Sequence, residues 1–113
     1  MPNPFLPLNT CIADGEPHVF GNRVYLFGYH DKPRGDTFCV LDYEFWSAFV
    51  DNLSEWSCKG ISYCASQDPL YGEKLKYMYA PDVVQGFDGR FYLYYCMSGD
   101  KGVGGSGQRI SVA

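Results

Sequence analysis

The sequence predicts an all-β protein, and three observations support this fold class. Of the 113 residues, 20 are aromatic (2 Trp, 10 Tyr and 8 Phe) and another 20 are Gly or Pro (13 and 7). Aromatic residues are enriched in strands, whereas Gly and Pro mark tight turns. The third observation is a pair of similar hairpin patterns that recur about 67 residues apart, counted from Arg23 to Arg90 (90 − 23 = 67).

Two aromatic segments are the clearest predicted strands. They cover residues 23–29 and 90–96, and each follows a turn signal, Gly21-Asn22 or Asp88-Gly89. Such dipeptides between apolar runs are typical of β-hairpins. Both segments are therefore predicted to be the second strands of hairpins.

Shorter strands complete the prediction. The first strands of the two hairpins, two later strands of the first unit and a third strand of the second unit are expected at residues 16–20, 82–85, 37–43, 56–64 and 108–113. The glycine-rich stretch 99–107 is interpreted as a loop, because no Lys-Ser/Thr follows it as in a phosphate-binding loop. Four antiparallel strands followed by a restart are the layout of a β-propeller blade.

The two hairpins form an internal repeat. Arg, Tyr and Leu at positions 23, 25 and 26 recur 67 positions later, and Asp14 recurs 68 positions later as Asp82. A period of 67 divides the chain into roughly 1.7 blades (113/67), whereas propellers close with at least about 4. We therefore predict part of a propeller, with blade one at about residues 14–66 and a partial blade two at about residues 79–113. The alternative is a small β-sandwich whose hairpins are similar by chance.

Composition excludes several classes of partner. The net charge is −4, with 9 Lys and Arg against 13 Asp and Glu, which argues against nucleic acid. No stretch approaches the roughly 18 apolar residues of a membrane span, and the first residues carry no signal-peptide pattern, so a cytoplasmic protein without a membrane partner is expected. The five cysteines have neither the even number of a disulfide framework nor zinc-site spacing, and we expect buried free thiols. Neither a cofactor nor a metal ion is expected.

One acidic residue stands out as a candidate for chemistry. Asp14 lies just ahead of the first predicted strand, and in a propeller the first strand of each blade lines the central channel. A carboxylate there faces any ligand in the channel, and pairs of carboxylates are what glycoside hydrolysis needs. The alternative is a turn residue, because Asp before Gly is common in turns.

The sequence resembles glycoside hydrolase family 43, the five-bladed propeller enzymes that include β-xylosidases and α-L-arabinofuranosidases. The likeness covers nearly the whole chain. Its separate pieces follow one another in the family's order. They are Asn3-Pro4-Phe5-Leu6-Pro7, Ala13-Asp14 with His18-Val19-Phe20, Tyr25-Leu26 with His30-Asp31, then Ser47, Leu53 and Trp56, and last Tyr79-Ala80-Pro81-Asp82 leading into residues 88–95.

The resemblance implies a role for Asp14. It matches the family's general base, the carboxylate that activates water to attack the anomeric carbon with inversion. The family usually has Pro after this Asp, whereas this chain has Gly15 followed by Glu16, so Glu16 remains the alternative. The family's pKa-modulating Asp and its general-acid Glu belong to later blades, beyond Ala113. We therefore expect the isolated chain to be inactive.

The resemblance also implies residues that contact an oligosaccharide substrate. His30 and Asp31 end the second strand on the side of the family's pocket, and Tyr79 stands where the family more often has Trp. Asp82 is interpreted as a pocket-lining or structural acid. For His30 and Asp31 the alternative is a solvated loop. His18 lies in an apolar run and is expected to be a core histidine.

Together, these observations predict that the chain is an N-terminal part of an inverting glycosidase that acts on xylose- or arabinofuranose-containing oligosaccharides. Its partners would be the substrate and either later blades of the same protein or a second copy that pairs with open strand edges. The alternative hypothesis is that the chain is a non-catalytic carbohydrate-binding or interaction fragment of a propeller.

Overall fold

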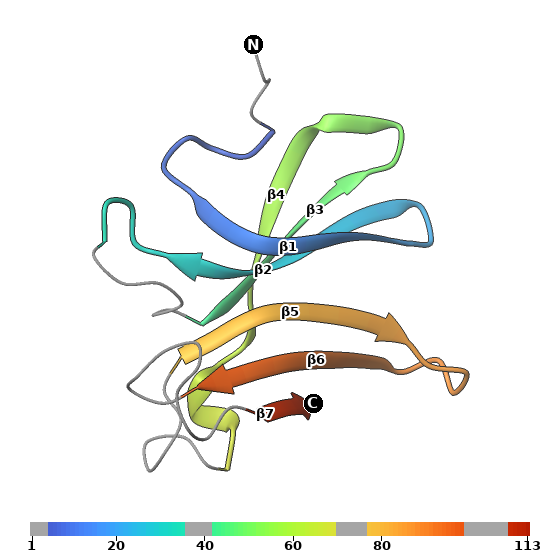
Figure 1. The fold of residues 1–113 in the computed structure, drawn as a ribbon. Coiled ribbons are helices and arrows are strands. Elements are labelled where there is room, and N and C mark those ends of the chain that lie inside the picture. Colours follow the sequence, from blue (N-terminus) through green and yellow to red (C-terminus); the bar gives the residue numbers. More distant parts are fainter. Residues whose placement is uncertain (1–4, 36–41, 70–76, 99–108) are drawn as a thin grey trace.

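The fold comes from a computed structural model that describes residues 5–35, 42–69, 77–98 and 109–113. Within these residues the strands form two antiparallel sheets (Figure 1). The first sheet has the order β1-β2-β3-β4, from strands β1 (Cys11–Phe20), β2 (Arg23–Asp31), β3 (Tyr43–Phe49) and β4 (Asn52–Tyr63). The second has the order β5-β6-β7, from β5 (Tyr77–Gln85), β6 (Phe91–Ser98) and β7 (Arg109–Val112). The 3₁₀ turn η1 (Ala65–Gln67) follows β4.

Both predicted hairpins are confirmed. β1 pairs with β2 and β5 with β6, and the turn glycines Gly21 and Gly89 have φ angles of 63° and 79°. These left-handed angles are accessible to glycine without a steric penalty, which explains why the turns form at these positions. β1 and β5 both begin several residues earlier than the sequence pattern predicted, at Cys11 and Tyr77.

The predicted position of the third strand was wrong. A strand was expected at residues 37–43, but the third strand of the sheet, β3, covers Tyr43–Phe49; residues 36–41 lie outside the described part of the chain. Trp46 and Ala48 are buried, so packing fixes this strand. The tight turn that follows, at Val50-Asp51, contains neither Gly nor Pro, and the usual hairpin signal was therefore missing.

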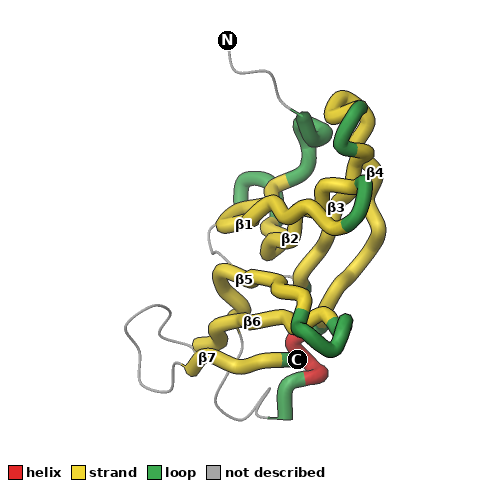
Figure 2. Tube along the Cα trace, turned by 90° about the vertical axis from the view of Figure 1, so that its right-hand side faces the viewer, coloured by secondary structure: helices red, strands yellow, loops and turns green. Residues whose placement is uncertain are grey.

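The two sheets share one core. Its buried members come from both sheets: Tyr29, Tyr43, Met78, Tyr95 and Met97. Hydroxyl groups add polar links, because Tyr43 donates to the backbone oxygen of Tyr79 (2.7 Å) and Tyr95 donates to Asp68 Oδ2 (2.8 Å). Figure 2 shows the resulting arrangement, in which the sheets lie one above the other as separate layers.

The strands β1 and β5 are neighbours across the boundary between the sheets. Each is an edge strand of its own sheet, and the two lie side by side in both ribbon views (Figures 1 and 2). Each also contains a proline, Pro17 or Pro81, which cannot donate to a ladder and is therefore confined to edge strands or bulges. The positions of both prolines are thus consistent with edge strands.

Two further expectations meet the structure here. Among the described residues, no helix is both long and apolar enough to cross a bilayer. The expectation of buried thiols was wrong for Cys58, which is exposed on the outer strand β4, and Cys11, Cys64 and Cys96 are half-buried free thiols. Cys39 lies outside the described residues.

Candidate active site

Asp14 lies in a β-bulge near the start of β1. Ala13 pairs with Tyr29 and Glu16 with Phe27, so Asp14 and Gly15 together face the single residue Gly28. The φ angle of Asp14 is 50°, in the left-handed region that Asp and Asn tolerate better than most side chains. Its side chain is exposed and has no hydrogen bond or ion pair with the rest of the described chain. The bulge thus presents an unpaired carboxylate at an inner edge.

The second sheet contains the same bulge at the corresponding place. Tyr79 pairs with Cys96 and Asp82 with Tyr94, so Ala80 and Pro81 form the bulge, and its first residue, Ala80, has a φ angle of 36°. Matching the two bulges aligns Asp14 with Ala80 (80 − 14 = 66). The alignment of Asp14 with Asp82 suggested by the sequence repeat was therefore wrong.

The same register assigns the counterpart of Asp82. Asp82 is the first residue after its bulge, as Glu16 is in β1 (82 − 16 = 66), and both side chains are exposed. Pro81 is fully buried and holds the place of Gly15. The proline that the family resemblance led us to expect after the base thus stands in the second bulge.

His18 was missed as a residue of this region. It is half-buried rather than a core residue, and its Nε2 lies 2.6 Å from Oδ1 of Asp82, which links β1 to β5. The same Asp82 oxygen accepts a hydrogen bond from the backbone N–H of Val83 (2.9 Å). Asp82 therefore has a structural task between the sheets, and only its Oδ2 is left for a ligand. Spacing along the sequence gave no signal for this pair, because its members are 64 positions apart.

The other predicted site residues lie in two places. His30 and Asp31 end β2 opposite Ile12 and Cys11, at the same end of the hairpin as the Asp14 bulge. Tyr79 lies at the start of the second bulge, partly buried against the core, and its backbone oxygen accepts the Tyr43 hydroxyl. The structure therefore brings four predicted residues to the starts of β1 and β5 and the end of β2, with Asp82 just beyond the second bulge.

The two tryptophans do not join this group. Trp46 is buried and its Nε1 donates to Glu44 Oε2 (3.1 Å). Trp56 packs against Phe5 with ring centroids 5.2 Å apart, and its Nε1 donates to the backbone oxygen of Leu53 (2.9 Å). Both indole groups therefore serve packing in the first sheet.

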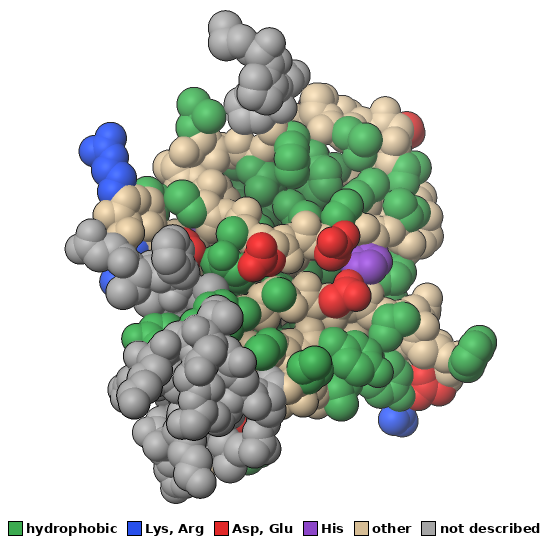
Figure 3. Space-filling model, viewed as in Figure 1, with side chains coloured by type: hydrophobic (Ala, Val, Ile, Leu, Met, Phe, Trp, Pro, Cys, Tyr) green, Lys and Arg blue, Asp and Glu red, His purple; other side chains and the backbone are tan. Residues whose placement is uncertain are grey.

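The face around these strands is acidic. Figure 3 shows acidic side chains and a histidine gathered where β1 and β5 lie next to each other. Glu16 on β1 and Asp82 on β5 are exposed, and His18 on β1 contacts Asp82. Across the described ranges, no three His, Cys, Asp or Glu side chains are grouped so as to hold a metal ion. The arrangement offers carboxylates for proton transfer and hydrogen bonding.

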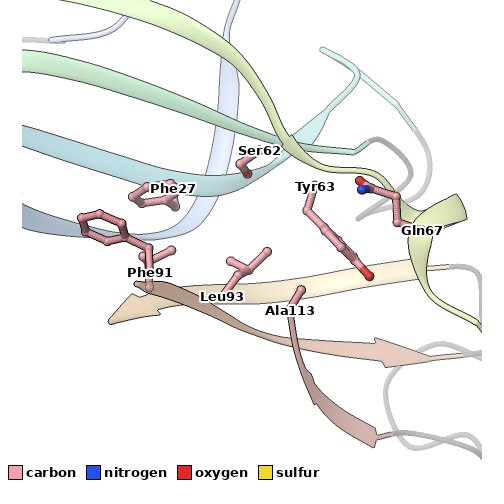
Figure 4. Close-up of a pocket in the computed structure, with 8 residues that line it drawn as sticks. Phe27, Ser62, Tyr63, Gln67, Phe91, Leu93 and Ala113 are labelled. Carbon is pink, nitrogen blue, oxygen red and sulfur yellow. The ribbon is translucent and has the colours of Figure 1, made fainter. Parts of the chain in front are cut away.

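A separate cavity of about 360 Å³ lies between the two sheets (Figure 4). It is lined by Phe27, Ser62, Tyr63, Gln67, Val83, Phe91, Leu93 and Ala113, and it contains none of the predicted site residues. Phe27 from β2 and Phe91 from β6 approach each other across it (Figure 4). This cavity is a mainly apolar space between the two sheets and is distinct from the acidic face.

The chain is similar in sequence to two curated proteins. No family model matches the chain. It is 50% identical over 95 residues to a protein named xylosidase/arabinosidase from Thermoclostridium stercorarium, covering 84% of this chain and 20% of that protein. It is 28% identical over 111 residues to xylosidase/arabinosidase 43A from Humicola insolens, covering 91% and 33%. The chain thus spans between one fifth and one third of these relatives.

Solved structures agree with the sequence relatives. A GH43_1 enzyme from Xanthomonas citri superposes with a TM-score of 0.76 at 25% identity, over 98% of this chain and 30% of that one. The chain is similar to a fragment of glycoside hydrolase family 43 enzymes. The β-xylosidase RS223 shares the fold of the chain, with a TM-score of 0.68 at 22% identity over 90% of the chain and 31% of the enzyme. The predicted β-propeller fragment is thereby confirmed.

Proposed function

We propose that this chain is part of an inverting glycoside hydrolase that acts on xylose- or arabinofuranose-containing oligosaccharides, with Asp14 as the general base. The observation that carries the proposal is the exposed carboxylate of Asp14, held in a bulge at an inner strand edge without a partner among the described residues. The names of the relatives, xylosidase/arabinosidase, support the substrate class.

The proposed chemistry is a single displacement. The Asp14 carboxylate accepts a proton from a water molecule while the water oxygen attacks the anomeric carbon from the face opposite the leaving group. The bond to the glycosidic oxygen breaks, and a general acid protonates that oxygen. In inverting enzymes the two carboxyl groups stand roughly 6.5–9.5 Å apart, which leaves room for the water.

The general acid is proposed to lie outside this chain. General acid catalysis commonly contributes about 10²–10⁴-fold, so the isolated chain is expected to give no measurable turnover. We propose that His30, Asp31 and Tyr79 contact the sugar, since they lie near the Asp14 bulge and the start of β5. We propose that Asp82 contacts the sugar through Oδ2, because its Oδ1 already forms hydrogen bonds with His18 Nε2 and the backbone N–H of Val83.

The test uses a chimera in which this chain replaces the matching part of the Thermoclostridium stercorarium relative. Asp14→Asn should abolish hydrolysis of aryl xylosides and arabinofuranosides, whereas Glu16→Gln, the matched control two positions away, should retain it. In Asp14→Gly, added azide should restore cleavage and give a glycosyl azide of inverted configuration. Loss of activity on Glu16→Gln but not on Asp14→Asn would transfer the role to Glu16. Ligand binding without turnover in the unmutated chimera would favour the non-catalytic alternative.

We also propose that other blades of the same protein cover this chain, because it has exposed apolar surfaces. Ile110 and Val112 on the edge strand β7 are 79% and 54% exposed. An apolar groove of about 410 Å³ lies on the first sheet, lined by Phe5, Gly15, Pro17, Val24, Leu26, Leu53 and Trp56. Light scattering on the isolated chain tests this proposal. Uncovered edges should give oligomers that grow with concentration, whereas a compact monomer at all concentrations would contradict it.

A further inference from the structure

The bulge that carries Asp14 needs support from its surroundings. A residue with a side chain in the left-handed region costs roughly 1–2 kcal/mol relative to ordinary backbone. Such conformations persist only where neighbouring structure holds them. For Asp14 the facing strand is β2, and the residue opposite the bulge is Gly28.

Gly28 has no room for a side chain. A Cβ atom there would lie 2.2 Å from Ile12 Cγ2, 3.1 Å from the backbone oxygen of Ala13 and 3.5 Å from Gly15 Cα. Ile12 is β-branched, so its Cγ2 cannot easily rotate away, and the other two atoms belong to the backbone of β1. A methyl group at position 28 therefore displaces the segment of β1 that includes Asp14.

A bulge of this kind does not by itself require a glycine on the facing strand. In the second sheet the same bulge, at Ala80-Pro81, lies opposite Tyr95, a large buried side chain. The contact between the bulge and Gly28 is thus a feature of the first sheet, where the acidic residue stands. Gly15 adds to this contact, since a Cβ there would lie 3.0 Å from the backbone oxygen of Phe27.

We propose that Gly28 is a positioning residue for Asp14. Because Gly28 has no side chain, Ile12 and the bulge of β1 can pack against β2. This packing keeps Asp14 in the left-handed conformation that exposes its carboxylate. The catalytic meaning of this role rests on the proposed function of Asp14 as the base. The conformational part does not, so the two can be tested separately.

The conformational test uses NMR on the 113-residue chain. The three-bond coupling between the amide and α protons of Asp14, with its Cα and Cβ shifts, reports φ directly. Gly28→Ala should shift these values away from those of the unmutated chain, and the double variant Gly28→Ala with Ile12→Ala should return them. Gly86→Ala is the matched control, because the atoms nearest to its Cβ would belong to the side chains of Tyr92 and Asp88, not to β1. It should leave the Asp14 signals unchanged.

Two results would overturn the proposal. The first is a folded Gly28→Ala chain with unaltered Asp14 signals. The second is a Gly28→Ala chain that fails to fold and is not restored by Ile12→Ala, since the Ile12 contact would then not be the decisive one.

The catalytic test uses the chimera. Gly28→Ala should lower kcat by about 10²-fold, the scale expected for misplacement of a catalytic group, with KM unchanged and with recovery on adding Ile12→Ala. If Asp14→Asn abolishes activity but Gly28→Ala leaves kcat intact, the positioning role fails alone. If Asp14→Asn leaves activity intact, the proposed function fails, whereas the NMR result still decides the positioning role.

Discussion

His18 on β1 and Asp82 on β5 form a side-chain contact that joins the two sheets, with 2.6 Å between Nε2 and Oδ1. The side chains are 31% and 58% exposed, so water and salt screen the pair. The contact matters for the fold because of its position: it links β1 and β5, the two strands that contain the bulges. Exposed pairs of this kind contribute about 0.2–1 kcal/mol.

The first prediction concerns this pair. A double-mutant cycle with His18→Ala, Asp82→Ala and both together should give a coupling energy of about 0.2–1 kcal/mol at pH 6 and low salt. The free energy of unfolding is measured by urea denaturation of the chain. Because Debye screening shortens to about 3 Å at 1 M salt, the coupling should fall there. Strictly additive effects at low salt would show that the pair does not link the sheets energetically.

A second prediction concerns the buried Tyr95 hydroxyl. It donates to Asp68 Oδ2 (2.8 Å) and lies 3.0 Å from the hydroxyl of Tyr63 on β4, so it joins the second sheet to the first. Tyr95→Phe removes the donor next to a buried carboxylate and should lower the free energy of unfolding by about 1–3 kcal/mol. Tyr94→Phe, at an exposed neighbouring position, should change it by less than about 0.5 kcal/mol. Equal effects of the two variants would contradict the role of the buried hydroxyl.

The same hydroxyl gives a prediction about pH. Burial, followed by the hydrogen bonds with Tyr63 and Asp68, raises the pKa of Tyr95 above its ordinary value. The unfolded chain therefore releases this proton first, at a pKa of about 10. The stabilisation is fully present below that pH and is lost as the pH rises further. In urea denaturation from pH 8 to 11.5, the stability difference between the unmutated chain and Tyr95→Phe should stay constant up to about pH 10 and then shrink; a constant difference throughout would disprove it.

Much of the fold could be predicted from sequence because its signals are local. The turn glycines Gly21 and Gly89 and the aromatic runs after them define both hairpins without any knowledge of tertiary structure. β3 could not be placed in this way. Its position depends on the burial of Trp46 and Ala48 against the rest of the first sheet, and the turn after it has no local signal.

The candidate site was predictable in part for the same reason. Asp14 stands in a motif that can be read along the chain, and the structure places it at an inner edge. The relation between Asp14 and Ala80 was hidden, because the repeat shifts from 67 in the second strands to 66 in the first strands. Only the strand register shows which residues occupy equivalent bulge positions. The His18–Asp82 pair was hidden as well, since it depends on how two sheets meet.

A fourth prediction concerns Cys58, an exposed thiol on β4. Partial desolvation of the sulfur and the nearby Glu44 carboxylate, which accepts from Sγ at 3.3 Å, raise the pKa of Cys58, and the Gly60 N–H only partly offsets this rise. Because the thiolate is the reactive form, alkylation of Cys58 at pH 7.5 should be slower than that of an unperturbed thiol. Glu44→Gln should accelerate it several-fold, as followed by iodoacetamide labelling and peptide mass spectrometry. The labelling rate of half-buried Cys96 serves as the control, and an unchanged Cys58 rate would rule out the effect of Glu44.

The last prediction uses the equivalence of the two bulges. Asp14 and Ala80 have φ angles of 50° and 36°, and Asn and Asp tolerate this region better than Ala. Asp14→Ala should therefore lower the free energy of unfolding by about 0.5–1 kcal/mol, and Ala80→Asn should raise it by a similar amount. Asp14→Asn is the matched control, since it removes the charge but keeps the left-handed preference, and it should leave stability unchanged. If Asp14→Ala and Asp14→Asn were equally stable in urea, the backbone conformation would not be what this position selects. If both lost stability equally, the carboxylate would have a structural partner, and its availability as a base would be in doubt.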